Sequence, residues 1–111
     1  MSIEQTNIVD MVGISRVSGK VILTVSDHLA WDAQEHEHLM LLQEKINTYL
    51  RFVESGEIYQ EYPDARNRQV LIEIVGKYPL SEKAKAFYAA VEVVVKQSGF
   101  EIGFELFAKN V

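Results

Sequence analysis

The spacing of hydrophobic residues changes several times along the chain, and each change predicts an element. Apolar and polar residues alternate over 6–14, 20–27, 69–78 and 100–109, which is typical of β-strands. Before the third of these segments, apolar residues recur every three or four positions, as on one side of an α-helix. After it, the polar residues Glu82, Lys85, Glu92 and Lys96 form one narrow stripe at helical spacing in a mostly apolar segment. This period predicts helices over about 33–55 and over 82–98.

Turn and capping residues support these boundaries. Gly19, in a short connection between the first two strands, predicts an antiparallel hairpin. Asp32, with a glutamate three residues later, predicts a capping box at the start of the first helix, and Gly56 predicts its left-handed end. Ser81 and Gly99 bracket the second helix in the same way.

The connection between the first helix and the third strand contains 58–62, which predicts a short edge strand ended by Pro63. The resulting order is β-β-α-β-α-β. A helix between the third and fourth strands predicts a parallel crossover, and both helices should cover the same face of the sheet. The expected fold class is therefore α+β, a two-layer sandwich with a mixed four-stranded sheet and two helices on one face, forming a single domain over 1–111.

The alternation also assigns the two faces of the sheet. The core-facing residues expected in the first and last strands are Ile8, Val12, Ile14, Phe100, Ile102, Phe104 and Leu106. The uncovered face interleaves Ile22, Leu71, Val75 and Phe107 with Thr24, Glu73, Glu101 and Glu105. This pattern is compatible with a contact surface and equally with an ordinary solvated face that carries scattered apolar side chains or is shielded by 59–62. The broad apolar surface of the second helix favours a homodimer.

Composition and charge indicate which partners are disfavoured and which cellular compartment is expected. Lysine and arginine number 11 against 16 aspartates and glutamates, giving a net charge of −5, which disfavours nucleic acid and anionic membranes as partners. The chain has no cysteine, which excludes disulfides, thiolate nucleophiles and cysteine-type zinc sites and suits a reducing compartment. No secretory signal is visible and no apolar run approaches the roughly 20 residues of a membrane span, so a cytoplasmic location is expected.

The stretch 27–44 is the electrostatic anomaly, with five acids, three histidines and no lysine or arginine. Its polar residues include His28, Asp32, His36 and His38, but the last two are separated by about 200° around a helix. A helix start that carries acids because of the helix dipole explains the stretch better than a metal site. No metal ligand is therefore predicted.

Catalytic signatures are also missing. Neither glycine-rich nucleotide motif nor a Gly-x-Ser-x-Gly elbow occurs, so we predict no cofactor and no catalytic residue. Asp10, within an apolar strand, is either a buried acid able to transfer protons or a polar residue at a strand edge, and the second interpretation is favoured.

Two functional hypotheses remain. The first is a non-enzymatic protein-interaction module that presents an acidic surface to a protein partner. The candidate surface comprises Asp27, His28, Trp31, Asp32, Glu35, His36, Tyr59 and Tyr62. Its aromatic residues either anchor the partner or pack as a lid over the edge of the core. The alternative is a small-molecule or metal-binding enzyme that uses His28, Asp32 and His36 near the start of the first helix.

Several short strings resemble an uncharacterised bacterial family of small α+β proteins, classed as a domain of unknown function. The strings are EQTNIVD (4–10), SDHLAWD (26–32), LLQEKIN (41–47), FVESG (52–56) and EYPD (61–64). The resemblance covers most of the chain. It implies a compact, stand-alone bacterial cytoplasmic protein, and it brings no substrate and no catalytic residue with it.

Overall fold

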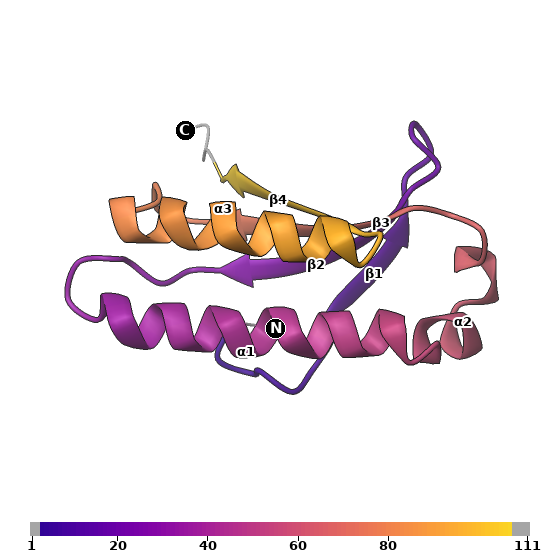
Figure 1. The fold of residues 1–111 in the computed structure, drawn as a ribbon, viewed down its shortest axis with the longest axis horizontal. Coiled ribbons are helices and arrows are strands. Elements are labelled where there is room, and N and C mark those ends of the chain that lie inside the picture. Colours follow the sequence, from indigo (N-terminus) through magenta and orange to yellow (C-terminus); the bar gives the residue numbers. More distant parts are fainter. Residues whose placement is uncertain (1–2, 108–111) are drawn as a thin grey trace.

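The computed structural model describes residues 3–107, in which two long helices lie across a four-stranded sheet. The strands are β1 (Met11–Ile14), β2 (Val21–Asp27), β3 (Val70–Gly76) and β4 (Glu101–Leu106). The helices are α1 (Glu35–Glu54), the short α2 (Glu57–Glu61) and α3 (Glu82–Gln97), and a 3-10 turn (Pro63–Ala65) follows α2. Figure 1 shows α1 and α3 side by side on the same side of the sheet.

The sheet has the strand order β1-β2-β3-β4. β1 is antiparallel to β2, whereas β2, β3 and β4 are parallel to one another, because a helix carries the chain back between each parallel pair. The predicted mixed sheet, with two long helices on one face, is therefore confirmed. The carboxyl ends of the parallel strands and the starts of α1 and α3 lie at the same end of the molecule (Figure 1).

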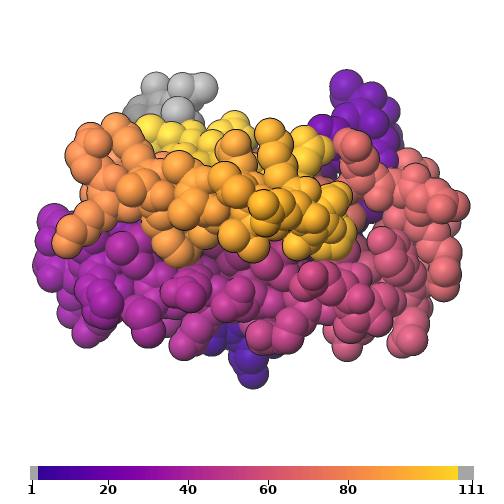
Figure 2. Space-filling model, in the orientation of Figure 1, coloured from indigo at the N-terminus to yellow at the C-terminus, as the bar shows by residue number. Residues whose placement is uncertain are grey.

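The hydrophobic core lies between the helices and the covered face of the sheet. In the middle of this face, Leu23, Ile72 and Ile102 are buried neighbours on three adjacent strands. The buried apolar residues of α1 are Leu42, Ile46, Tyr49, Phe52 and Val53, whereas α3 buries only Ala84 and Val95. Figure 2 shows α3 lying against α1 in this helical layer. Burying each large side chain contributes about 1.5–3 kcal/mol, so α1 is the principal cover of the sheet.

The helix ends only partly follow the sequence prediction. The predicted capping box is wrong, because α1 begins after Gln34, which makes no side-chain cap, and Asp32 instead accepts a hydrogen bond from the adjacent Ala33 amide. At α3 the prediction is confirmed, since the Ser81 hydroxyl accepts a hydrogen bond of 3.1 Å from the Ala84 amide. Gly56 and Gly99 have φ values of 83° and 89°, as predicted for left-handed helix ends.

The edge strand predicted over 58–62 is wrong. The chain leaves α1 through Gly56 and immediately forms α2, whose Ile58 is fully buried against the core. The backbone groups of this segment therefore form hydrogen bonds within a short helix and not with a neighbouring strand. Pro63 begins the 3-10 turn rather than ending a strand.

β1 is shorter than the sequence predicted, because residues 6–10 are not in a strand. Ile8 lies before β1 and is exposed. Ile14 and Leu106 pair with Val21 and Gly76 on the covered face, as predicted, but they remain 38% and 43% exposed at the ends of their strands. The predicted continuation of β4 to Lys109 lies outside the described residues. None of the helices within residues 3–107 combines the length and the apolar composition that crossing a bilayer requires.

Candidate functional site

The eight residues of the candidate surface occupy several different places. Asp27 and Trp31 are buried and cannot belong to an exposed surface. His28 follows β2 and lines a hollow with Val75 and Phe107. Asp32, Glu35 and His36 lie at the start of α1, whereas Tyr59 and Tyr62 lie on and after α2, at the other end of α1. The 20-residue helix between these groups is about 30 Å long, so one partner side chain cannot contact both (Figure 1).

A buried histidine joins α1 to the end of β2. The Nε2 atom of His38 lies 2.7 Å and 2.6 Å from the two carboxylate oxygens of Asp27, and its Nδ1 atom lies 3.1 Å from the carbonyl oxygen of Ala30. A carbonyl accepts hydrogen bonds and cannot donate them, so Nδ1 carries a proton. The Nε2 atom faces the carboxylate, so the imidazole ring bridges the Ala30 carbonyl and the Asp27 side chain.

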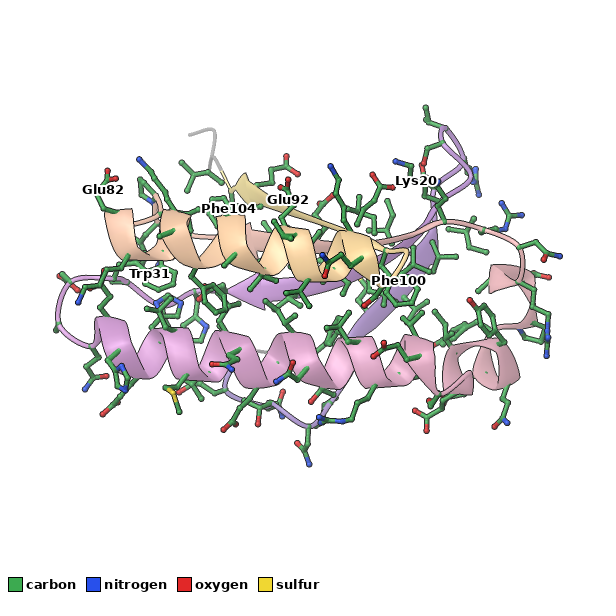
Figure 3. The ribbon with its side chains drawn as sticks, viewed as in Figure 1. Lys20, Trp31, Glu82, Glu92, Phe100 and Phe104 are labelled. Carbon is green, nitrogen blue, oxygen red and sulfur yellow. The ribbon has the colours of Figure 1, made fainter. Side chains whose placement is uncertain are left out.

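Aromatic side chains enclose this pair. The Trp31 ring stacks on His38 with centroids 3.5 Å apart, at the end of the molecule where α1 and α3 begin (Figure 3). Burial, together with the nearby Asp27 carboxylate, raises the pKa of Tyr88. The side chains of His38 and Asp27 are only 1% and 2% exposed, so a substrate has no access to either group. We therefore interpret the pair as a structural link.

The sequence-predicted histidines do not assemble into a metal centre. His36 is exposed whereas His38 is buried, as their separation around the helix predicted, and His28 lies 3.5 Å from Glu4. Within residues 3–107, no group of three or more histidine, aspartate or glutamate side chains has the arrangement needed to hold a metal ion. The metal-binding form of the enzyme hypothesis therefore finds no cluster of ligating residues within the described part of the chain.

A second buried charge, Lys45, attaches the N-terminal segment to α1. Its Nζ atom donates to the carbonyl oxygens of Gln5 and Ile8, both at 2.7 Å, and lies 2.8 Å from the carboxylate of Asp10. Asp10 is therefore a buried acid, but its ion pair with Lys45 assigns it a structural role. These contacts also explain the short β1, because carbonyl groups bound to Lys45 follow a path that does not pair with β2.

Tyr49 completes this cluster. Its hydroxyl donates to the Thr24 carbonyl at 2.9 Å and accepts from the Asp10 amide at 3.1 Å. Burial raises the pKa of Tyr49 to about 12; the hydrogen bond from Asp10 opposes that effect and the Asp10 carboxylate adds to it. Sequence reasoning missed His38 and Lys45 as buried residues. Their spacing with Leu42 and Tyr49 placed them on the buried side of α1, but their charge argued against burial.

The opposite face of the sheet has a different character. Its residues, which we call the open face, are Ile22, Thr24, Ser26, Leu71, Glu73, Val75, Glu101, Gly103 and Glu105. The helices lie on the other side of the sheet (Figure 1), and the apolar residues of the open face are only half-buried. The alternation along the strands predicted this mixture of apolar and acidic side chains.

The acids of the open face are unequally neutralised. Lys20 lies 2.9 Å from Glu101. For Glu73 and Glu105, no lysine, arginine or histidine nitrogen of residues 3–107 lies within 4.0 Å. Partial burial, and then the neighbouring Glu105 carboxylate, raise the pKa of Glu73. The open face therefore keeps two like charges together among apolar side chains.

The helical layer has an apolar surface of its own. A groove of about 410 Å³ runs between α1 and α3, with Ile46, Leu50, Phe87 and Val91 among its lining residues. Val93 and Val94 of α3 are 57% and 56% exposed. Large apolar side chains in solvent cost free energy, so this surface is a second candidate for contact with another molecule.

Comparison with known proteins agrees with the class that the sequence indicated. A family model described as a family of unknown function (DUF6572) matches residues 1–108. The comparison with curated proteins finds no significant match, and the comparison with solved structures finds none either. The expected domain of unknown function is confirmed, whereas a bacterial origin stays a prediction. Because the match covers almost the whole chain, this protein belongs to the DUF6572 family.

Proposed function

We propose that this protein is a non-enzymatic protein-interaction module that works in the cytoplasm and presents an acidic surface to a protein partner. The observation that carries the proposal is the open face, where Glu73 and Glu105 lie together among half-buried apolar residues. Apolar patches edged by charge are typical of contact surfaces. The lack of cysteine suits a reducing compartment.

The open face supports this role better than the acids at the start of α1. Asp32 and Glu37 are exposed and solvated, and Glu35 has Lys83 at 3.9 Å. Acids at this position also favour the positive end of the helix dipole, which explains them without a partner. The Glu73–Glu105 pair has no comparable structural explanation, because neither acid has a cation among the described residues.

In-cell photo-crosslinking tests the proposal. We expect that p-benzoyl-phenylalanine in place of Thr24, near the centre of the open face, gives a covalent adduct with another protein, identified by mass spectrometry. The same group in place of Glu44, exposed on α1, is the matched control and should give no such adduct. Equal adducts at both positions, or none at Thr24, contradict the proposal.

The apolar surface of α3 supports a homodimer as a second activity. A closed two-fold contact would remove Val93, Val94 and the groove beside them from water in both copies. We expect a Val93→Lys, Val94→Lys variant to elute and sediment as a monomer at concentrations where the wild-type protein is a dimer. Val17→Lys, at a 99% exposed position before Gly19, is the control and should not change the mass. A wild-type monomer across the micromolar range contradicts this part of the proposal.

A further inference from the structure

Two neighbouring acids of the open face, Glu73 and Glu105, have no positively charged partner among the described residues. Glu105 lies two residues beyond Gly103, the β4 partner of Glu73, so the two acids are diagonal neighbours on one face, while Glu101 on the same strand as Glu105 is neutralised by Lys20. Like charges in a partly apolar setting lower the stability of the fold. A positive group placed between them reverses that effect.

The backbone leaves space for such a group. Gly103 is the β4 partner of Glu73 and precedes Glu105 by two residues, so it lies on the same face beside both acids. A Cβ atom built on Gly103 meets no other atom within 4 Å. The space beside the two acids is therefore accessible from the solvent side of the sheet, and the backbone of Gly103 lies beneath it.

We propose that the open face binds a second protein that presents an arginine or lysine flanked by apolar side chains. The cation lies over Gly103 and pairs with the carboxylates of Glu73 and Glu105. The apolar flanks cover Ile22 and Leu71, which are neighbours on β2 and β3. This inference rests on the proposed interaction function and specifies the chemistry of the partner.

Charge complementarity selects this occupant over a second copy of the chain. Two copies that met through their open faces would bring two Glu73–Glu105 pairs into one desolvated interface, where like charges repel strongly. An arginine fits best, because its planar guanidinium can donate to two carboxylates at once and packs well against apolar surface.

A pair of matched peptides tests the partner chemistry. The probe is a labelled eight-residue peptide with valine, arginine and valine at every second position, so that an extended peptide presents arginine and its apolar flanks on one side. Its control has the neutral isostere citrulline in place of arginine. Nuclear magnetic resonance titration should show shifts at the open-face amides of β2, β3 and β4, with binding at least about tenfold weaker for the citrulline peptide. Shifts confined to the helical layer overturn the inference.

Variants separate the acid pair from the general negative charge. Glu73→Gln with Glu105→Gln should weaken binding of the arginine peptide by at least about tenfold. Asp32→Asn with Glu37→Gln removes the same charge from the start of α1 and should leave binding unchanged. Equal losses in the two double variants overturn the inference, because they indicate attraction to net charge alone.

Two further measurements decide between occupants. Removal of residues 108–111, which include Lys109, should leave peptide affinity within about twofold; a large gain shows that the chain's own end occupies the face and overturns the inference. A wild-type dimer that Glu73→Lys dissociates also overturns it, in favour of a second copy. A crosslink at Thr24 without any preference for the arginine peptide would preserve the interaction function and reject only the cationic partner.

Discussion

The two faces of the sheet hold their charged side chains in opposite ways. On the covered face and beneath α1, each buried titratable side chain of these pairs has a polar partner: Lys45 contacts Asp10, and His38 contacts Asp27. On the open face, Glu73 and Glu105 crowd each other without a cation among the described residues. Buried ion pairs hold segments in register, whereas crowded like charges weaken the fold that carries them.

This difference separates the charges that hold the fold together from the charges that the proposed partner would contact. The paired charges connect elements that are distant in the chain, namely the N-terminal segment with α1 and the end of β2 with α1. The unpaired acids connect no distant elements, and they are the groups that the proposed partner would neutralise. Four predictions test this contrast, from the largest expected effect to the smallest.

Lys45→Ala should destabilise the protein most, by about 3–5 kcal/mol, because it leaves the Asp10 carboxylate and two backbone carbonyls buried without a cation. The free energy of unfolding from urea titration measures this loss. Arg51→Ala removes an exposed cation from the same helix and should change stability by less than about 0.5 kcal/mol. A Lys45→Ala variant as stable as that control would show that the buried pair does not hold the N-terminal segment.

Glycine substitutions compare the packing of the two faces directly. At Gly76 an added Cβ would lie 2.5 Å from the Phe104 ring, so Gly76→Ala should cost about 1–2 kcal/mol as the ring is displaced. At Gly103 it meets nothing within 4 Å, and Gly103→Ala should be neutral or slightly stabilising. Thermal unfolding of the two variants checks the difference, and equal melting temperatures would contradict it.

Substitutions at Ser81 and Asp32 compare the stability that the residues before α3 and α1 contribute. Ser81→Ala removes a hydroxyl that accepts the Ala84 amide and should cost about 1 kcal/mol. Asp32→Ala removes a side chain that lies before α1 and caps no turn, so its cost should stay below about 0.5 kcal/mol. Chemical denaturation measures both. A reversed order would restore the capping box that the sequence predicted.

Glu73→Gln should stabilise the protein at pH 7, by about 0.5 kcal/mol, because it removes a like-charge contact. The pKa of Glu73 is raised in the folded state, so the folded protein holds this proton more tightly than the unfolded chain. Binding of this proton stabilises the folded protein below the ordinary pKa of 4.5, and the stabilisation is lost as the pH rises through the folded-state pKa of Glu73. The advantage of Glu73→Gln should therefore shrink in acid, as denaturation at pH 4 and pH 7 would show. Glu44→Gln, which changes the net charge equally, should show no such pH dependence if the Glu73–Glu105 contact is responsible.

Much of the fold was predictable because local periods determine it. Alternation in β2 and β3 and the three- to four-residue spacing in α1 and α3 identify those elements without tertiary information. The same alternation placed Glu73, Glu101 and Glu105 on the uncovered face. The candidate surface near α1 was predicted less well. Local patterns did not show that Asp27 and Trp31 would be buried in contact with His38.

The sequence by itself determined the strands, the two long helices, their order and which strand residues share a face. These follow from the geometry of each element, in which every second or every third to fourth residue points the same way. Only the tertiary structure decided which charges meet. Lys45 reaches Gln5 across 40 positions, and Glu73 lies beside Glu105 because β3 and β4 pair in one register. Contacts of this kind depend on how elements pack, and no local pattern records that.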